Sequence, residues 1–130
     1  MDSKNFSVFY GYRGRVCLRM VLEAAGVRKG DYVVCQSFTC VAVPEAIISI
    51  GAKPLFVDTE NSFVNLSVND LEKKISTNKL VKAVVIQHTY GIKFPAKKLS
   101  YLKNKYDITF IEDCCHLPFD IHTYSLNRDH

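Results

Sequence analysis

The amino-acid sequence predicts an α/β fold, a mostly parallel β-sheet with flanking helices. Four short apolar runs rich in β-branched and aromatic residues have the character of strands. Four segments with helical spacing of apolar residues lie before and between these runs. Strict alternation of helix and strand favours parallel strands joined by right-handed crossovers. The 130 residues are enough for one modest domain with its own core.

The predicted strands show no alternation of polar and apolar side chains. That pattern is typical of strands that helices cover on both faces of a sheet. The four runs span residues 32–35, 54–57, 82–86 and 107–111.

Each of the first two predicted helices ends at a glycine. The first covers about residues 15–25 and stops at Gly26, and the second covers about residues 43–50 and stops at Gly51. Glycine after the last apolar position is a common helix stop signal.

The third predicted helix opens at Ser67, which we expect to act as its N-cap, with Asp70 in its first turn. Leu66 and Leu71 are spaced for a hydrophobic staple across this start. The fourth helix covers about residues 96–105.

The domain is expected to span residues 1–120. Residues 121–130 carry neither helical nor strand periodicity and are predicted to be an irregular C-terminal tail. The chain stops soon after its last predicted strand, where a parallel sheet would continue into another helix, so we expect an incomplete domain.

Composition narrows the classes of function. The net charge is +4, from 17 Lys and Arg against 13 Asp and Glu, and no basic stretch is interleaved with aromatic residues. We therefore expect no nucleic-acid binding. No apolar run is long enough to span a membrane, and the N-terminus lacks a secretion-signal pattern, so we expect no membrane association and a cytoplasmic location.

Five cysteines, an odd number, are predicted to be free thiols in a reducing compartment. Adjacent Cys114 and Cys115 are poorly placed to ligate one metal ion, and no C-x-x-C pair is present. We expect small buried residues here and no metal site.

The carboxyl ends of the strands are the predicted functional edge. In open α/β sheets ligands bind at this edge, and here it gathers polar and aromatic residues, in particular 36–39, Asp58, 87–91 and 113–116. Asp113 should sit where the last strand ends, after Glu112 begins the turn. A carboxylate there can hold a cationic ring nitrogen, coordinate a metal, act as a base or cap a following helix.

Other side chains at this edge have structural as well as functional interpretations. His116 is able to fold back beside Asp113, or to be a packed histidine. Phe38 and Tyr90 can be core residues or can stack on a ligand. Gly14 before the first helix permits close approach of an anion to free backbone N–H groups, and Arg15 can add hydrogen bonds.

Five ordered segments resemble those of one family, the DegT/DnrJ/EryC1/StrS family of pyridoxal-phosphate-dependent aminotransferases, which often act on nucleotide-linked sugars. The similarity runs from about Phe9 to Leu117. The matching segments span residues 22–34, 37–47, 51–58, 87–91 and 111–116.

The resemblance implies part of the large domain of an aspartate-aminotransferase-like, fold type I transferase that uses pyridoxal phosphate. Asp113 matches the carboxylate that holds the pyridine nitrogen, and His116 matches a position near the ring. Gly14 and Arg15 match the phosphate-binding turn, although the family commonly has a small hydroxyl residue at the position of Arg15. Cys40 stands where the family commonly has an aromatic that stacks on the ring, and Phe38 is the substitute candidate.

The family's Schiff-base lysine lies downstream of the segment that carries Asp113. The 14 residues after His116 contain no lysine, so we expect a chain that is inactive alone. The resemblance is compatible with a second chain that supplies the C-terminal part, or with a homodimer. Two alternatives remain: a non-enzymatic domain that binds a phosphorylated ligand or serves in assembly, and a metal-dependent hydrolase using Asp58 or Asp113.

Overall fold

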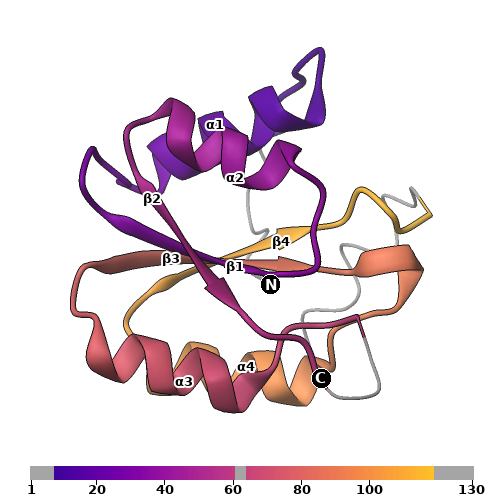
Figure 1. The fold of residues 1–130 in the computed structure, drawn as a ribbon. Helices are drawn as coiled ribbons and strands as arrows, with labels where there is room; N and C mark the ends of the chain where they lie inside the picture. The colour runs from indigo at the N-terminus through magenta and orange to yellow at the C-terminus, as the bar shows by residue number, and fades with distance from the viewer. Residues whose placement is uncertain (1–7, 61–63, 119–130) are drawn as a thin grey trace, which may run out of the picture.

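The computed structural model describes residues 8–60 and 64–118 as a three-layer α/β/α arrangement (Figure 1). Four α-helices and four strands alternate along this part of the chain, and a short 3-10 helix, η1 (Thr89–Gly91), follows β3. The helices are α1 (Gly14–Ala24), α2 (Ala42–Ser49), α3 (Val68–Thr77) and α4 (Ala96–Lys105). The strands are β1 (Tyr32–Gln36), β2 (Lys53–Val57), β3 (Val81–Gln87) and β4 (Thr109–Asp113).

All strand pairs of the sheet are parallel, and the strand order is β2-β1-β3-β4. The predicted α/β class and parallel sheet are therefore confirmed. From β1 the chain moves to one side to form β2, and it then crosses to the other side of β1 to form β3 and β4. The carboxyl ends of β1 and β3 thus flank the point where the strand order reverses, the position at which ligands bind in such sheets.

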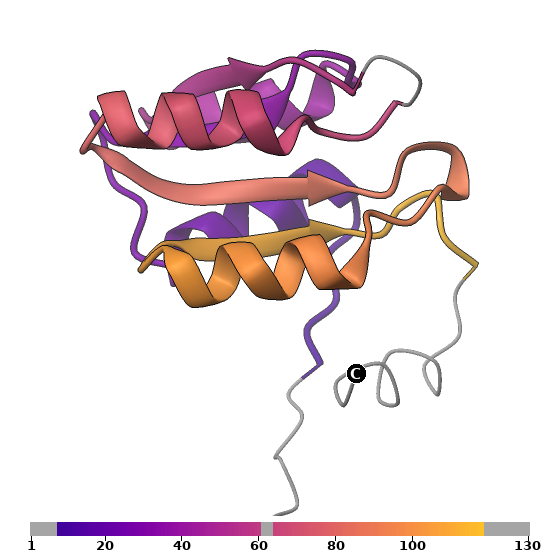
Figure 2. The same cartoon turned by 90° about the horizontal axis from the view of Figure 1, so that it is seen from below.

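Helices cover both faces of the sheet. Helices α1 and α2 lie on one face and α3 and α4 on the other, as Figures 1 and 2 show. Each face has its own apolar core, because alternate side chains of a strand point in opposite directions. Val33 and Cys35 of β1 pack under α1 and α2, whereas Val34 packs over α3 and α4.

The predicted element positions agree with the structure to within two residues, and the largest difference is at the last strand. We expected a strand over residues 107–111 with Glu112 starting the turn, but β4 spans Thr109–Asp113. Glu112 pairs with Ile86 and Asp113 with Gln87 in the ladder. The prediction for Glu112 was wrong because the neighbouring strand β3 continues to Gln87 and supplies a partner for both acidic residues.

The start of α3 differs from the expectation in its cap. Ser67 makes no side-chain cap hydrogen bond. The N–H of Val68 instead donates to Oε1 of Glu60 at 3.4 Å, so an acid from the preceding loop occupies this end of the helix. Leu66 and Leu71 are both buried in the same core cluster, as a hydrophobic staple requires.

The predicted tail, residues 121–130, lies outside the described residues. No helix among the described residues has the length and apolar character needed to cross a membrane.

Candidate functional site

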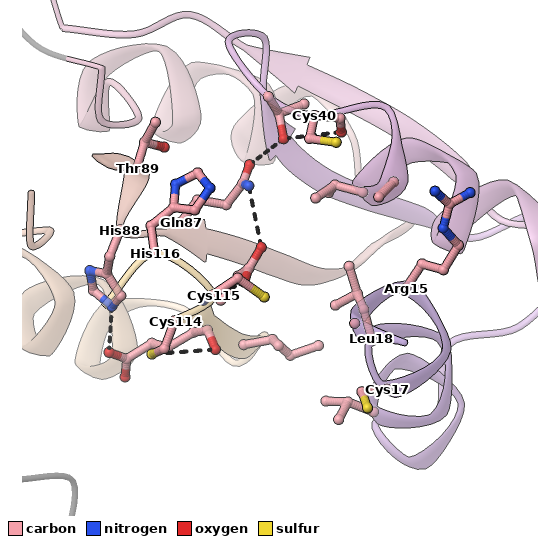
Figure 3. A pocket seen from close by; sticks show the side chains of 18 of the residues that line it. Arg15, Cys17, Leu18, Cys40, Gln87, His88, Thr89, Cys114, Cys115 and His116 are labelled. Atoms are coloured by element: carbon pink, nitrogen blue, oxygen red, sulfur yellow. Dashed lines mark hydrogen bonds and ion pairs between the residues drawn. The ribbon is translucent and has the colours of Figure 1, made fainter. Parts of the chain in front are cut away.

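A pocket of about 960 Å³ opens at the carboxyl end of the sheet, between α1, the loop that leads into α2, and the ends of β3 and β4 (Figure 3). Its lining includes every site residue predicted from the sequence. These residues are Gly14, Arg15, Phe38, Cys40, Asp113 and His116. Asp58, also expected at this edge, is absent from the lining, because β2 is the edge strand farthest from β4.

Asp113 ends β4, and hydrogen-bond donors hold both of its carboxylate oxygens. The backbone N–H of Cys115 donates to Oδ1 at 3.1 Å, and Nε2 of Gln87 donates to Oδ2 at 3.3 Å. An ionised carboxylate has about four acceptor sites, so acceptor capacity remains for a ligand. Neither donor carries a charge, and the carboxylate is therefore oriented without being neutralised.

Gln87 lies between Asp113 and Thr39. The hydroxyl of Thr39 donates to Oε1 of Gln87 at 2.6 Å, which turns the amide N–H toward Asp113. Figure 3 shows Gln87 with one dashed line to the loop that carries Cys40 and the other to the turn that carries Cys115. Gln87 and Thr39 were expected at this edge of the sheet but were not among the predicted site residues. The sequence signal that could have indicated Gln87 was its position directly after the apolar run at residues 82–86.

His116 and Tyr90 form one unit across the pocket. The backbone N–H of Tyr90 donates to Nδ1 of His116 at 3.0 Å, and the two rings are parallel with centroids 5.9 Å apart. His116 therefore joins the turn after β4 to the turn after β3. It is exposed, which excludes the packed-histidine interpretation, and its hydrogen bond is to the backbone of Tyr90. Because Nδ1 accepts a hydrogen bond, the ring carries its hydrogen on Nε2 when it is neutral.

Phe38 is half exposed and contacts the ring of Tyr90 edge to face, with centroids 6.1 Å apart. Tyr90 is 70% exposed, so the core interpretation of both aromatics was wrong. Its φ of 54° is in the left-handed region that few non-glycine residues adopt, and such strain is concentrated at functional sites. Aromatic faces thus line one side of the pocket.

Gly14 begins α1, and Arg13 precedes it in extended conformation. The helix has no side-chain cap hydrogen bond and no acid in its first turn. A helix N-terminus with this composition favours an anion. A Cβ on Gly14 would meet only Sγ of Cys115, at 3.7 Å, so the chain's own packing leaves this backbone accessible from the pocket.

The Arg15 side chain is bound to another helix. Its guanidinium forms an ion pair with Glu45 of α2, and Figure 3 shows it pointing away from Gln87. Arg15 therefore offers its backbone N–H at the start of α1, whereas its guanidinium joins α1 to α2.

Cys115 is not an activated nucleophile. A hydrogen bond between the Cys115 side chain and Asp113, together with burial, raises the pKa of the thiol to about 11. The thiol therefore stays protonated at neutral pH. All five cysteines are free, but only Cys35 is fully buried. Cys114 is half-buried and Cys115 is exposed, which corrects the expectation that this pair is buried. Within the described residues no cluster of three or more His, Cys, Asp or Glu could hold a metal ion.

His88 is a buried residue of the pocket lining and has a structural role. Its Nδ1 accepts the N–H of Phe94 at 3.0 Å, and its Nε2 lies 3.3 Å from Oε2 of Glu112. Contacts with Cys114 and Glu112 raise the pKa of His88 to about 9. The hydrogen bond from the Phe94 N–H opposes protonation of the His88 ring, because this bond requires a free lone pair on Nδ1. The ring thus fastens the segment after β3 to β4.

We expect Glu112→Gln to lower stability by about 0.2–1 kcal/mol at pH 7, as for other partly exposed pairs. The hydrogen bond from His88, and then the charge of Lys103 with Nζ 3.3 Å away, lower the pKa of Glu112 below its ordinary 4.5. A lowered folded-state pKa gives stability that is complete above pH 4.5 and is lost as the pH falls through the folded value. Denaturant unfolding should therefore show a smaller deficit of the variant at pH 3 than at pH 7. An equal deficit at both values would contradict this assignment.

Comparison with known proteins identifies the family to which this arrangement belongs. The model of the DegT/DnrJ/EryC1/StrS aminotransferase family matches residues 13–117. The chain belongs to this family. The match includes all six predicted site residues.

Several curated relatives are named for amino-sugar enzymes. The chain is 37% identical over 101 residues to GDP-perosamine synthase of Vibrio cholerae, which covers 78% of this chain and 27% of the relative. It is 32% identical over 101 residues, with the same coverages, to UDP-N-acetyl-3-dehydro-alpha-D-glucosamine 3-aminotransferase of Acidithiobacillus ferrooxidans. The chain thus spans about a quarter of the length of these relatives.

Solved structures confirm the predicted fold. The chain matches DesV of S. venezuelae, solved in complex with a ketimine intermediate, with a TM-score of 0.75 and 26% identity over 80% of this chain and 28% of DesV. It also matches the fold of ntda from Bacillus subtilis, solved with bound cofactor pmp, with a TM-score of 0.76. The fold is that of part of a fold type I pyridoxal-phosphate-dependent transferase.

Proposed function

We propose that this chain is the cofactor-binding part of a pyridoxal-phosphate-dependent aminotransferase that acts on nucleotide-linked sugars. One observation carries the proposal: a single pocket is lined by an uncapped helix N-terminus at Gly14 and by the oriented carboxylate of Asp113. Pyridoxal phosphate carries an anionic phosphate and a basic ring nitrogen. The donor set therefore fits this cofactor at both of its ends.

Each residue has a defined part in this proposal. The backbone N–H groups at the start of α1 would bind the phosphate, and Asp113 would keep a proton on the ring nitrogen. His116 would present Nε2–H to the ring, while Phe38, and Cys40 at the entry to α2, would bound the pocket. When bound, the cofactor supplies a ring that accepts electrons from the reacting carbon.

The substrate class and the assembly rest on the relatives. Names such as GDP-perosamine synthase indicate that the amino acceptor is a sugar attached to a nucleoside diphosphate. We propose that residues 1–120 form an incomplete large domain. A second chain, or a homodimer, would complete the site. Five free cysteines support a cytoplasmic location.

Pyridoxamine phosphate should bind to this chain, and Asp113→Asn should weaken binding by about 10- to 100-fold, because a hydrogen bond to a charged group is lost. Fluorescence titration measures both affinities. Asp58→Asn is the matched control: it removes an acid at the same sheet edge but outside the pocket, and its affinity should be unchanged.

A second function has one observation in its favour, because no lysine lines the pocket among the described residues. A non-enzymatic domain that binds phosphorylated ligands would need only the start of α1. Equal affinity of wild type and Asp113→Asn for pyridoxamine phosphate would contradict the proposed aminotransferase site. Binding of other phosphorylated ligands with similar affinity would then support the second function.

A further inference from the structure

We infer that Gln87 is a positioning residue for Asp113: it holds the carboxylate in the orientation that receives a protonated ring nitrogen. The inference rests on the proposed function and deepens it. Gln87 is the last residue of β3, is 8% exposed, and pairs directly with Asp113, the last residue of β4. Paired residues on neighbouring parallel strands project to the same face of a sheet. This register brings the amide to 3.3 Å from Oδ2.

The orientation of the Gln87 amide is fixed from its other end. A glutamine amide has one accepting and one donating end. The Thr39 hydroxyl donates to Oε1 at 2.6 Å, so the accepting end faces the loop before α2 and the donating end faces Asp113. Three segments far apart in the sequence are thereby connected: the loop after β1, the end of β3 and the end of β4.

The chemical nature of the donor matters as much as its position. A lysine or arginine in place of Gln87 would form an ion pair with Asp113 and compete with a cationic ligand. An amide donates without charge, so the carboxylate retains its full attraction for a protonated nitrogen. With the Cys115 N–H on Oδ1, Gln87 on Oδ2 orients both oxygens and leaves acceptor capacity for a ligand.

Two ligands isolate this role. One is pyridoxamine phosphate, and the other is its 1-deaza analogue, in which a C–H group replaces the ring nitrogen. Both carry the phosphate, but only the first can engage Asp113 through that nitrogen. The wild-type chain should bind pyridoxamine phosphate about 10- to 100-fold more tightly than the analogue.

Gln87→Leu removes the donor and retains an uncharged side chain of similar size. It should reduce the preference between the two ligands at least about 5-fold and leave affinity for the deaza analogue unchanged. Thr39→Val frees the amide to rotate and should reduce the preference by a smaller factor. Far-ultraviolet circular dichroism establishes that each variant is folded. If Gln87→Leu does not fold, Thr39→Val decides the question.

The outcomes separate this inference from the proposed function. A purely structural role for Gln87 predicts equal loss of affinity for both ligands, and that result would overturn the inference. An unchanged preference in Gln87→Leu, when Asp113→Asn abolishes it, would overturn the inference alone. If the wild-type chain shows no preference, the assignment of Asp113 fails and the positioning role fails with it.

Discussion

No transaminase turnover is expected from this chain alone when it is mixed with pyridoxal phosphate, an amino donor and a keto-sugar nucleotide. Family enzymes need an amine as the nucleophile that links to the cofactor. Among the described residues, the pocket lining contains no lysine. Three lysines of α4 are paired with acids: Lys98 with Glu60, Lys103 with Glu112 and Lys105 with Glu72.

The measurement is product formation by chromatography, compared with a sample that holds the cofactor and substrates without protein. The two rates should agree, whereas typical enzymes turn over about 1–1,000 times per second. Asp113→Asn serves as a second control, because it alters the proposed site without changing any lysine. A rate about 10-fold above the protein-free sample, and lost in Asp113→Asn, would show that an amine of this chain reaches the site.

Measurements of binding and of turnover distinguish two properties of this chain: affinity for the cofactor and the ability to carry out the reaction. Affinity for pyridoxamine phosphate without turnover is the result expected of a pocket with its carboxylate and anion site in place and no lysine in its described lining. A partner that completes the site would then restore turnover without increasing the contribution of Asp113 to binding. The two measurements are therefore independent tests of separate parts of the proposal.

The order of elements could be predicted from the sequence because it depends on local signals. Gly26 and Gly51 have φ of 81° and 75°. The predicted helix ends therefore coincide with left-handed backbone positions, which favour glycine because it has no Cβ. Apolar runs marked all four strands, and the clearest runs belong to β1 and β3, which are the most buried strands. These signals need no knowledge of neighbouring segments.

The connections between side chains could not be predicted in the same way. Glu112 was expected to leave the sheet, and only its pairing with Ile86 keeps it in β4. The Gln87 amide acquires its role from Thr39 and Asp113, which lie 48 and 26 residues away. Sequence alone did not show that Tyr90 lies outside the core, because its ring stacks on His116, which lies 26 residues away. Each of these contacts depends on register between strands, which sequence spacing does not specify.

Helix α1 depends on one anchor, and replacement of that anchor is expected to have the largest effect on stability among the changes considered. Leu22 is the one residue of α1 that is fully buried, and it packs with Val33 and Ile47 in the core beneath α1 and α2. Leu22→Ala should lower the free energy of unfolding by about 2–5 kcal/mol, from lost apolar burial and the cavity that remains. Urea unfolding measures this change. Met20→Ala, at a 46% exposed position of the same helix, should change it by less than about 0.5 kcal/mol.

The same replacement also tests the link between packing and the site. Because α1 carries Gly14 to the pocket, loosening this helix should weaken binding of pyridoxamine phosphate beyond what global unfolding explains. Leu102→Ala is the matched comparison, since Leu102 is fully buried on α4 in the opposite core cluster. It should lower stability by a similar amount and leave the affinity of the folded fraction unchanged. Equal losses of affinity in both variants would mean that the site follows overall stability, and that the position of α1 is not what holds the phosphate.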